Sequence, residues 1–173
     1  MRFRPILAFI IVLLSAALAG SPCEAQLGFL PKFRIRAGIF NPSSPDLKSV
    51  SGDTWLKIGA DVSLPVGIPL VGGGTRVGID YMESKNSRIV PITLTQIIQP
   101  SAIVAHSPIY LGAGIGLFNG KISGRGSGTS LGARMLAGLD INGKLFVEAQ
   151  YDVVGKVAGT RIDGFSFMVG TKF

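Results

Sequence analysis

The chain has 173 residues, of which 47% are hydrophobic and only 16% charged, with 24 glycines and a formal net charge of +7. This length suits a single domain. The basic residues stand singly among apolar ones, which argues against a nucleic-acid-binding protein. The charged fraction is also low for a soluble protein, whose surface is normally about a quarter to a third charged.

Residues 1–25 have the features of a secretory signal peptide. The segment begins with Arg2 and Arg4, continues as an apolar run over 6–18, and ends on the small residue Ala25. Cleavage there leaves a mature domain over 26–173 without cysteine, so no disulfide is expected. A cut after Ala19 and an uncleaved anchoring helix are the alternatives, although the apolar run is shorter than the ~20 residues that span a bilayer.

From residue 33 onward, apolar and polar side chains alternate in segments separated by turn residues. The pattern predicts strands at about 33–41, 54–66, 75–82, 89–99, 109–117, 131–140, 145–153 and 165–173. Pro91 cannot donate a ladder hydrogen bond and is therefore placed at the beginning of the fourth strand. The predicted fold is all-β, an eight-stranded antiparallel up-and-down transmembrane β-barrel.

The polar face of these strands carries charges of both signs, and a basic residue at mid-bilayer costs roughly 2–4 kcal/mol. We therefore expect the apolar face to meet lipid and the charged face to form an ion-pair network in the lumen. The expected members are Arg34, Arg36, Lys57, Asp61, Arg76, Asp80, Arg134, Asp140, Lys144, Glu148, Asp152 and Lys172. Alternation alone leaves open a soluble barrel with an apolar interior.

The link between the sixth and seventh strands predicts a register. Both strands place even-numbered residues inward, so a three-residue loop, Ile141-Asn142-Gly143, would pair Asp140 with Lys144. Gly143 would take the left-handed conformation. Arg134 would then face Gln150, with Glu148 and Asp152 diagonal to it, which makes Arg134 the expected centre of the network.

Aromatic residues near the strand ends are expected at the membrane interfaces. These residues are Phe33, Phe40, Tyr81, Phe118, Tyr151 and Phe173. Both ends of the barrel domain should lie on the periplasmic side, because the number of strands is even. The loops at 41–52, 83–88, 119–130 and 155–161 should then face outward.

The sequence offers no catalytic or metal-binding constellation, so we expect neither an enzyme nor a cofactor. His106, the one histidine, falls in a predicted periplasmic turn, where a solvated role is expected. Gly72-Gly73-Gly74 lacks the Lys-Ser/Thr of a phosphate loop and is interpreted as a flexible turn. Asp61 and Asp80 are expected to approach each other, as part of the ion network or as a proton-sharing carboxylate pair.

Three segments carry a resemblance to a known family. They are Ile89 to Thr95, Pro108 to Gly116, and the closing strand to Phe173. In these segments the chain resembles the bacterial small outer-membrane β-barrel family, especially the outer-membrane protein W type and related eight-stranded porin-like domains. The resemblance implies the cell outer membrane, contact with its lipids, and delivery by periplasmic chaperones to the barrel assembly machinery.

The closing strand is similar to the signal that this machinery reads. The residues assigned to the signal are Phe165, Phe167, Val169 and Phe173. Thr171 and Met168 depart from the family pattern, in which an aromatic or aliphatic residue and a glycine are common.

Three functions are compatible with such a barrel. The first is a structural, membrane-integrity role with a lumen filled by side chains. The second, implied by the resemblance, is a narrow passage for small apolar molecules. A lipid-modifying barrel enzyme is the third and least supported. An interior formed by eight strands holds only side chains or one small ligand, which argues against a general aqueous porin. The sequence leaves the oligomeric state open.

Overall fold

The computed structural model describes residues 32–64, 74–99 and 108–173. The expected signal peptide, Gly72-Gly73 and the turn with His106 lie outside the described residues. The eight long strands are β1 (Phe33–Pro42), β2 (Trp55–Leu64), β3 (Thr75–Ser84), β4 (Ser87–Ile98), β5 (Ile109–Ile122), β6 (Gly126–Asp140), β7 (Leu145–Val154) and β10 (Gly164–Lys172).

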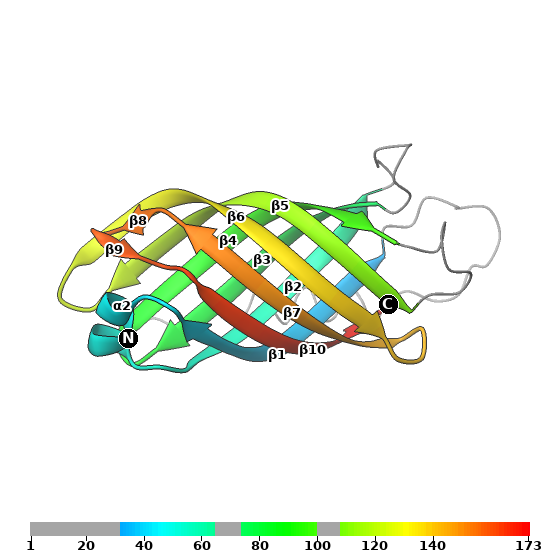
Figure 1. Ribbon diagram of the computed structural model, residues 1–173, viewed down its shortest axis with the longest axis horizontal. Helices are drawn as coiled ribbons and strands as arrows, with labels where there is room; N and C mark the ends of the chain where they lie inside the picture. Colours follow the sequence, from blue (N-terminus) through cyan, green and yellow to red (C-terminus); the bar gives the residue numbers. More distant parts are fainter. Residues whose placement is uncertain (1–31, 65–73, 100–107) are drawn as a thin grey trace, which may run out of the picture. The chain divides into compact units, whose positions relative to one another are not determined.

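These strands form a closed antiparallel barrel in the order β1-β10-β7-β6-β5-β4-β3-β2, which confirms the predicted fold (Figure 1). Consecutive long strands are neighbours, and β1 closes the barrel against β10 with pairs from Arg34–Lys172 to Pro42–Gly164. In the described part of the chain, no helix is long and apolar enough to cross a membrane.

Two short elements lie at one end of the barrel, where the sequence predicted plain loops (Figure 1). The helix α2 (Pro45–Ser51) follows β1, and a hairpin of β8 (Lys156–Val157) and β9 (Thr160–Arg161) follows β7. Pro45 suits the first turn of a helix because its φ is already fixed there. Gly52 ends the helix with φ of 86°, a value that glycine adopts without steric cost.

The predicted end of β5, the predicted beginning of β6 and the predicted position of Pro91 were wrong. β5 and β6 continue through the glycine-rich segment 119–130, where cross-strand pairing as far as Ile122–Gly126 outweighs the low strand propensity of glycine. Pro91 is the fifth residue of β4 rather than near its beginning. Between the pairs Ile79–Ile92 and Met82–Ile89 the β3–β4 ladder is interrupted, as expected around a residue that has no N–H.

The β6–β7 register predicted from the sequence was wrong by two residues. Asp140 pairs with Phe146 rather than Lys144, and Arg134 pairs with Asp152 rather than Gln150. The backbone N–H of Ile141 donates to the carbonyl of Leu145, so the loop begins at Asn142. The Asn142 side chain fixes this start because its oxygen accepts hydrogen bonds from the N–H groups of residues 144 and 145. Gly143 has the expected positive φ, 75°.

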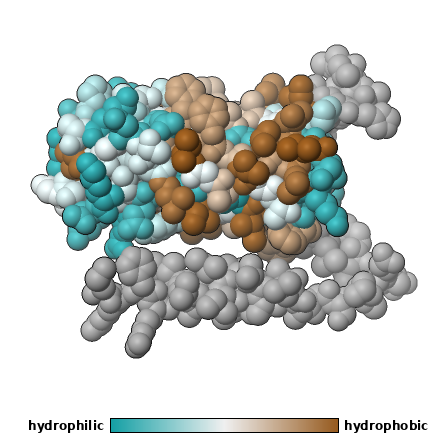
Figure 2. Space-filling model, turned by 90° about the horizontal axis from the view of Figure 1, so that it is seen from below, coloured by the Kyte–Doolittle hydropathy of each residue, from teal (hydrophilic) through white to brown (hydrophobic). Residues whose placement is uncertain are grey.

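The outer wall of the barrel is apolar. Large hydrophobic side chains from all eight long strands are exposed, for example Ile79 at 50%, Ile115 at 65% and Phe167 at 56%. Figure 2 shows brown, hydrophobic side chains over the middle of the barrel and mainly teal, hydrophilic ones at the end that carries α2. The described strands thus have the inverted arrangement, apolar outside and charged inside, that the sequence predicted.

Candidate functional site: a lumen filled by side chains

The inward faces of five strands bring eight charged side chains into the lumen. β1 provides Arg34 and Arg36, β2 Lys57 and Asp61, β3 Asp80, β6 Arg134, and β7 Glu148 and Asp152. Each of these residues is at most 4% exposed. Charges buried to this degree are stable only when they are paired. Some pairs join neighbouring strands, as Arg134–Asp152 does, and others, such as Arg134–Asp80 and Lys57–Asp152, connect strands that are not neighbours.

Arg134 lies at a junction of the network. Its Nε donates to Oδ1 of Asp152 at 2.7 Å, and its Nη1 donates to Oδ2 of Asp80 at 2.6 Å. The other oxygen of Asp80 accepts from Nη2 of Arg36 at 2.8 Å. Asp80 therefore bridges two arginines and links β1, β3 and β6 through the lumen. Glu148, which the sequence placed near Arg134, is not among its bonded partners.

Arg36 also lies between the two aspartates that the sequence expected to approach each other. It is hydrogen-bonded to Asp61 through Nη1 and to Asp80 through Nε and Nη2. A guanidinium shared in this way favours a structural ion network over a proton-sharing carboxylate pair.

Lys57 anchors a second part of the network. Its Nζ donates to Oε1 of Gln150 at 2.7 Å, to Oγ of Ser166 at 2.9 Å and to Oδ2 of Asp152 at 3.3 Å. The lysine is 0% exposed. Its ammonium group therefore bonds to side chains of β7 and β10. These strands lie on the other side of β1 from β2, so one side chain connects β2 to both of them across the lumen.

Toward the opposite end from α2, Arg34 organises a third part. Its Nη2 donates to the Tyr110 hydroxyl at 2.6 Å and to Glu148 at 3.3 Å, and the tyrosine donates to Glu148 at 2.9 Å. The guanidinium carbon lies 3.6 Å from the centre of the Phe146 ring, a cation–π arrangement. Tyr110 and Gln150 were not assigned to the network from the sequence, although their inward parity was a usable signal.

Four predicted members lie at or beyond the edge of the network. Asp140 and Lys172 form their own pair at 2.5 Å, each side chain 22% exposed. Arg76 is 12% exposed and lies 3.6 Å from Glu148. Lys144 is exposed, and the described residues offer it no ion pair, because the shifted loop places it in the turn.

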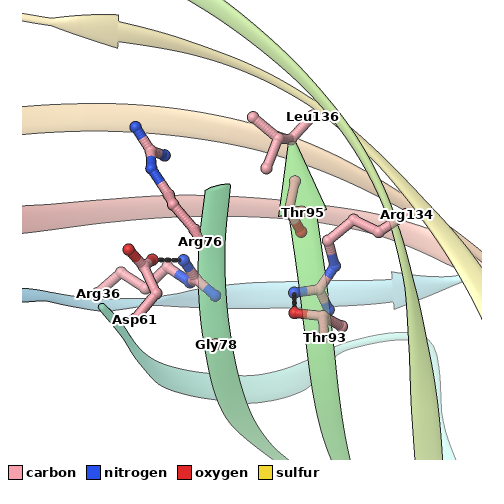
Figure 3. Close-up of a pocket in the computed structure, with 8 residues that line it drawn as sticks. All are labelled: Arg36, Asp61, Arg76, Gly78, Thr93, Thr95, Arg134 and Leu136. Carbon is pink, nitrogen blue, oxygen red and sulfur yellow. Dashed lines mark hydrogen bonds and ion pairs between the residues drawn. The ribbon is translucent and has the colours of Figure 1, made fainter. Parts of the chain in front are cut away.

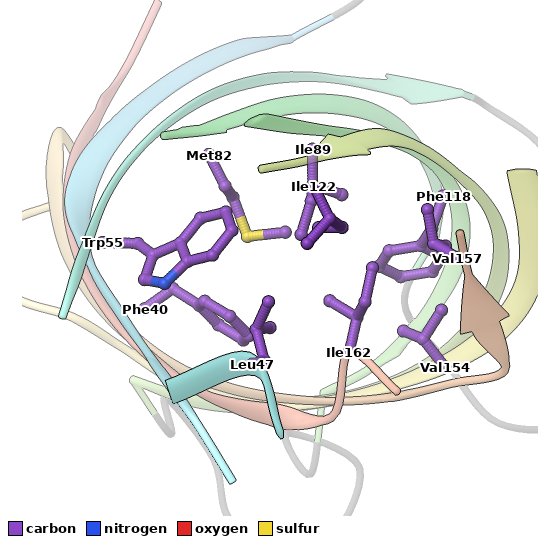
Figure 4. Packing of buried hydrophobic residues seen from close by; sticks show 10 residues of the cluster. All are labelled: Phe40, Leu47, Trp55, Met82, Ile89, Phe118, Ile122, Val154, Val157 and Ile162. Atoms are coloured by element: carbon purple, nitrogen blue, oxygen red, sulfur yellow. The ribbon is translucent and has the colours of Figure 1, made fainter. Parts of the chain in front are cut away.

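A separate apolar cluster lies inside the end of the barrel that carries α2 (Figure 4). The helix contributes Leu47, the segment after β9 contributes Ile162, and both are 0% exposed. Strand residues complete the cluster, which we call the cap: Phe40, Leu47, Trp55, Met82, Ile89, Phe118, Ile122, Val154, Val157 and Ile162. Phe40 and Phe118 were expected at a membrane interface; their even-numbered positions on β1 and β5 instead point them inward.

The polarity of the outward and inward faces of β5 changes along the strand. In the part of β5 up to Leu117, farther from α2, Ile115 and Leu117 are exposed while glycines face the lumen. Beyond Leu117, the exposed residues Asn119 and Lys121 are polar, and the inward residues Phe118 and Ile122 are apolar. Along β5, the barrel therefore has an apolar outer face up to Leu117, and a polar outer face with an apolar interior at the α2 end.

Within the residues that the structure describes, no group of three or more His, Cys, Asp or Glu side chains is placed to hold a metal ion. The charged lumen residues instead pair mainly with one another. Glycines make room for this packing: a Cβ at position 59 would lie 1.9 Å from Oδ1 of Asp80.

Comparisons with known proteins place the fold. No family model matches the sequence, and no curated protein matches it. The crystal structure of Neisserial surface protein A (NspA) is similar with 18% identity and a TM-score of 0.52, covering 83% of this chain and 97% of that one. The Yersinia pestis outer membrane protein Ail, in a phospholipid bilayer nanodisc, is similar with 11% identity and a TM-score of 0.55, covering 83% of this chain and 100% of that one. The chain therefore has the fold of the small outer-membrane β-barrels.

Proposed function

We propose that the protein is an integral barrel of the bacterial outer membrane with a closed lumen, and that its role is structural, in maintaining the membrane. The exposed apolar wall supports insertion in lipid, because so many large hydrophobic side chains at 36–71% exposure would not be stable in water. Folded in this way, the protein would contact lipids directly and would depend on periplasmic chaperones and the assembly machinery.

The main support for a closed lumen is that two layers of side chains, one charged and one apolar, lie one after the other along the barrel. The ion network fills the middle of the barrel and the cap fills the end at α2. A hydrated solute would meet the apolar cap, and an apolar solute would meet paired charges. The side chains of each layer also occupy the lumen, so either layer alone obstructs ions, and both together leave no path for either class of solute.

The test is conductance of the refolded protein in planar bilayers, with variants that open one layer or both. The wild type should show no steady conductance. Arg134→Ala and Trp55→Ala should each remain nearly closed, because the other layer is intact, whereas the double variant should conduct. Arg88→Ala, which removes an exposed charge on the outer wall, is the matched control. Steady wild-type conductance would overturn the proposal.

A narrow passage for small apolar molecules is the second candidate, and one observation favours it. The cap end of the lumen is lined by apolar side chains, including the flexible Met82. The test is the flux of an apolar solute into liposomes that contain the wild type. Flux that is abolished by a bulkier residue at Ala158, beside the cap, would favour this candidate over the closed barrel.

A further inference from the structure

A small cavity lies inside the barrel, between the ion network and β4. Its volume is about 10 Å³, close to the room that one water-sized particle needs. Figure 3 shows Arg36 and Asp61 on one side of it and Thr93 and Arg134 on the other, with Arg76 and Thr95 completing the polar lining. Three of these six side chains are cationic and one is anionic.

The charges of the lumen do not balance. The described network contains five cations (Arg34, Arg36, Lys57, Arg76 and Arg134) and four carboxylates (Asp61, Asp80, Glu148 and Asp152). The rim pair of Asp140 and Lys172 is neutral by itself. One positive charge is left over in an interior of low dielectric, where an uncompensated ion is costly.

Donors outnumber acceptors among the unpartnered polar groups of the cavity. Nη1 of Arg76 is buried and donates no hydrogen bond within the described part of the chain, and Oδ1 of Asp61 is buried and accepts none. Thr95 is 4% exposed and its hydroxyl has no hydrogen-bond partner among the described side chains. Thr93 accepts a bond from Arg134 at 3.3 Å, so its own proton is free to be donated into the cavity.

Gly78 lines the cavity, and a side chain at this position would crowd the polar groups around it. A Cβ on Gly78 would lie 3.3 Å from the Asp61 Cβ, 3.4 Å from Nη2 of Arg36 and 3.4 Å from Oγ1 of Thr93. A methyl group there would therefore project among the cavity's polar atoms. Any other residue at this position would reduce the space that the arginines and threonines surround.

We propose that this cavity binds one monatomic anion of the halide class. Arg76 and Arg134 supply the positive charge, and the hydroxyls of Thr93 and Thr95 supply neutral donors. Asp61 also lines the cavity. Its Oδ2 is bonded to Arg36, which reduces the repulsion of an anion, while its Oδ1 has no hydrogen-bond partner in the described part of the chain. Arg76 keeps 12% of its side chain exposed, so exchange with solvent is open at that end.

The direct test is X-ray diffraction from crystals of the refolded protein grown with sodium bromide, using the anomalous signal of bromine. An anomalous peak between Arg76 and Thr95 is expected in the wild type. It should persist in Gly74→Ala, where the added methyl meets only a carbonyl oxygen at 3.6 Å, and disappear in Gly78→Ala and Arg76→Gln. Density for water alone, or bromide only on the outer surface, would overturn the proposal.

A solution measurement keeps the proposal testable if a variant does not crystallise. The urea midpoint of the wild type in detergent should rise when gluconate is replaced by bromide at equal ionic strength, because the anion binds only the folded state. The rise should be lost in Gly78→Ala and retained in Gly74→Ala. Equal midpoints of the wild type in the two salts would contradict the site. The outcome does not depend on whether the barrel conducts.

Discussion

Arg134 on β6 and Asp152 on β7 are direct cross-strand partners, and two hydrogen bonds of 2.7 and 3.1 Å join their side chains inside the barrel. Arg134→Gln should destabilise the protein by about 3–5 kcal/mol, because two buried carboxylates, Asp80 and Asp152, each lose one of their cations. Adding Asp152→Asn should restore part of the loss. The measurement is a double-mutant cycle in urea-dependent refolding into detergent or lipid.

Glu148 provides the control for this cycle. It lies in the same strand as Asp152 and is equally buried, yet its partners are Arg34, Arg36 and Arg76. The effects of Arg134→Gln and Glu148→Gln should therefore be nearly additive. Strong coupling at Glu148 and none at Asp152 would show that the pairing across the lumen differs from the one described.

The cap predicts a stability effect at α2. Leu47 is fully buried although it lies in a connection rather than a strand, so Leu47→Ala should cost about 2–5 kcal/mol. Leu56→Ala, at an outward position that is 55% exposed, is the matched control and should cost much less. Equal losses in the two variants, measured by urea unfolding in detergent, would mean that α2 does not pack in the cap in solution.

The orientation of the barrel is testable on intact cells. Single cysteines at Ser44 and Ser127, at the α2 end, should react with an impermeant thiol reagent. Cysteines at Asn142 and Ser101, in loops expected to be periplasmic, should not react until the cells are opened. Labelling of the protein without an added cysteine measures the background reaction of Cys23, the one natural cysteine. The opposite labelling pattern would reverse the proposed topology.

The closing strand should matter for assembly more than for stability. Phe165, Phe167 and Val169 are exposed on β10, at 51%, 56% and 59%, and Phe173 ends the chain at 64%. Phe173→Ala should lower the amount of barrel in the outer membrane while the purified chain still refolds in detergent. Phe33→Ala, an exposed aromatic residue on β1, is the control and should assemble normally. Normal membrane levels of Phe173→Ala would contradict an assembly signal.

The sequence predicted what depends on the two-residue period of a strand. Arg34, Lys57 and Asp80 were placed inward by parity alone, and the structure buries all three. The period carries no information about connections, so Leu47 and Ile162, which enter the cap from α2 and from the segment after β9, could not be identified. The register at Arg134 was missed because it depends on which residue caps the turn, and the Asn142 side chain makes that choice.

The change of polarity along β5 fixes how deep the barrel can sit in a membrane. If the barrel moved outward, Leu117 and its neighbours would be exposed to water, and if it moved inward, Arg88 and Lys121, which face outward on paired strands, would enter the hydrocarbon. The cost of a basic residue on the lipid face rises with depth, from about 0–1 kcal/mol near the interface to about 2–4 kcal/mol at the midplane. Since the cap lies at this same level of the strands, the immersion depth of the barrel and the position of the cap are set by one stretch of sequence. A membrane of different thickness would therefore be expected to adapt to the barrel, rather than the barrel to the membrane.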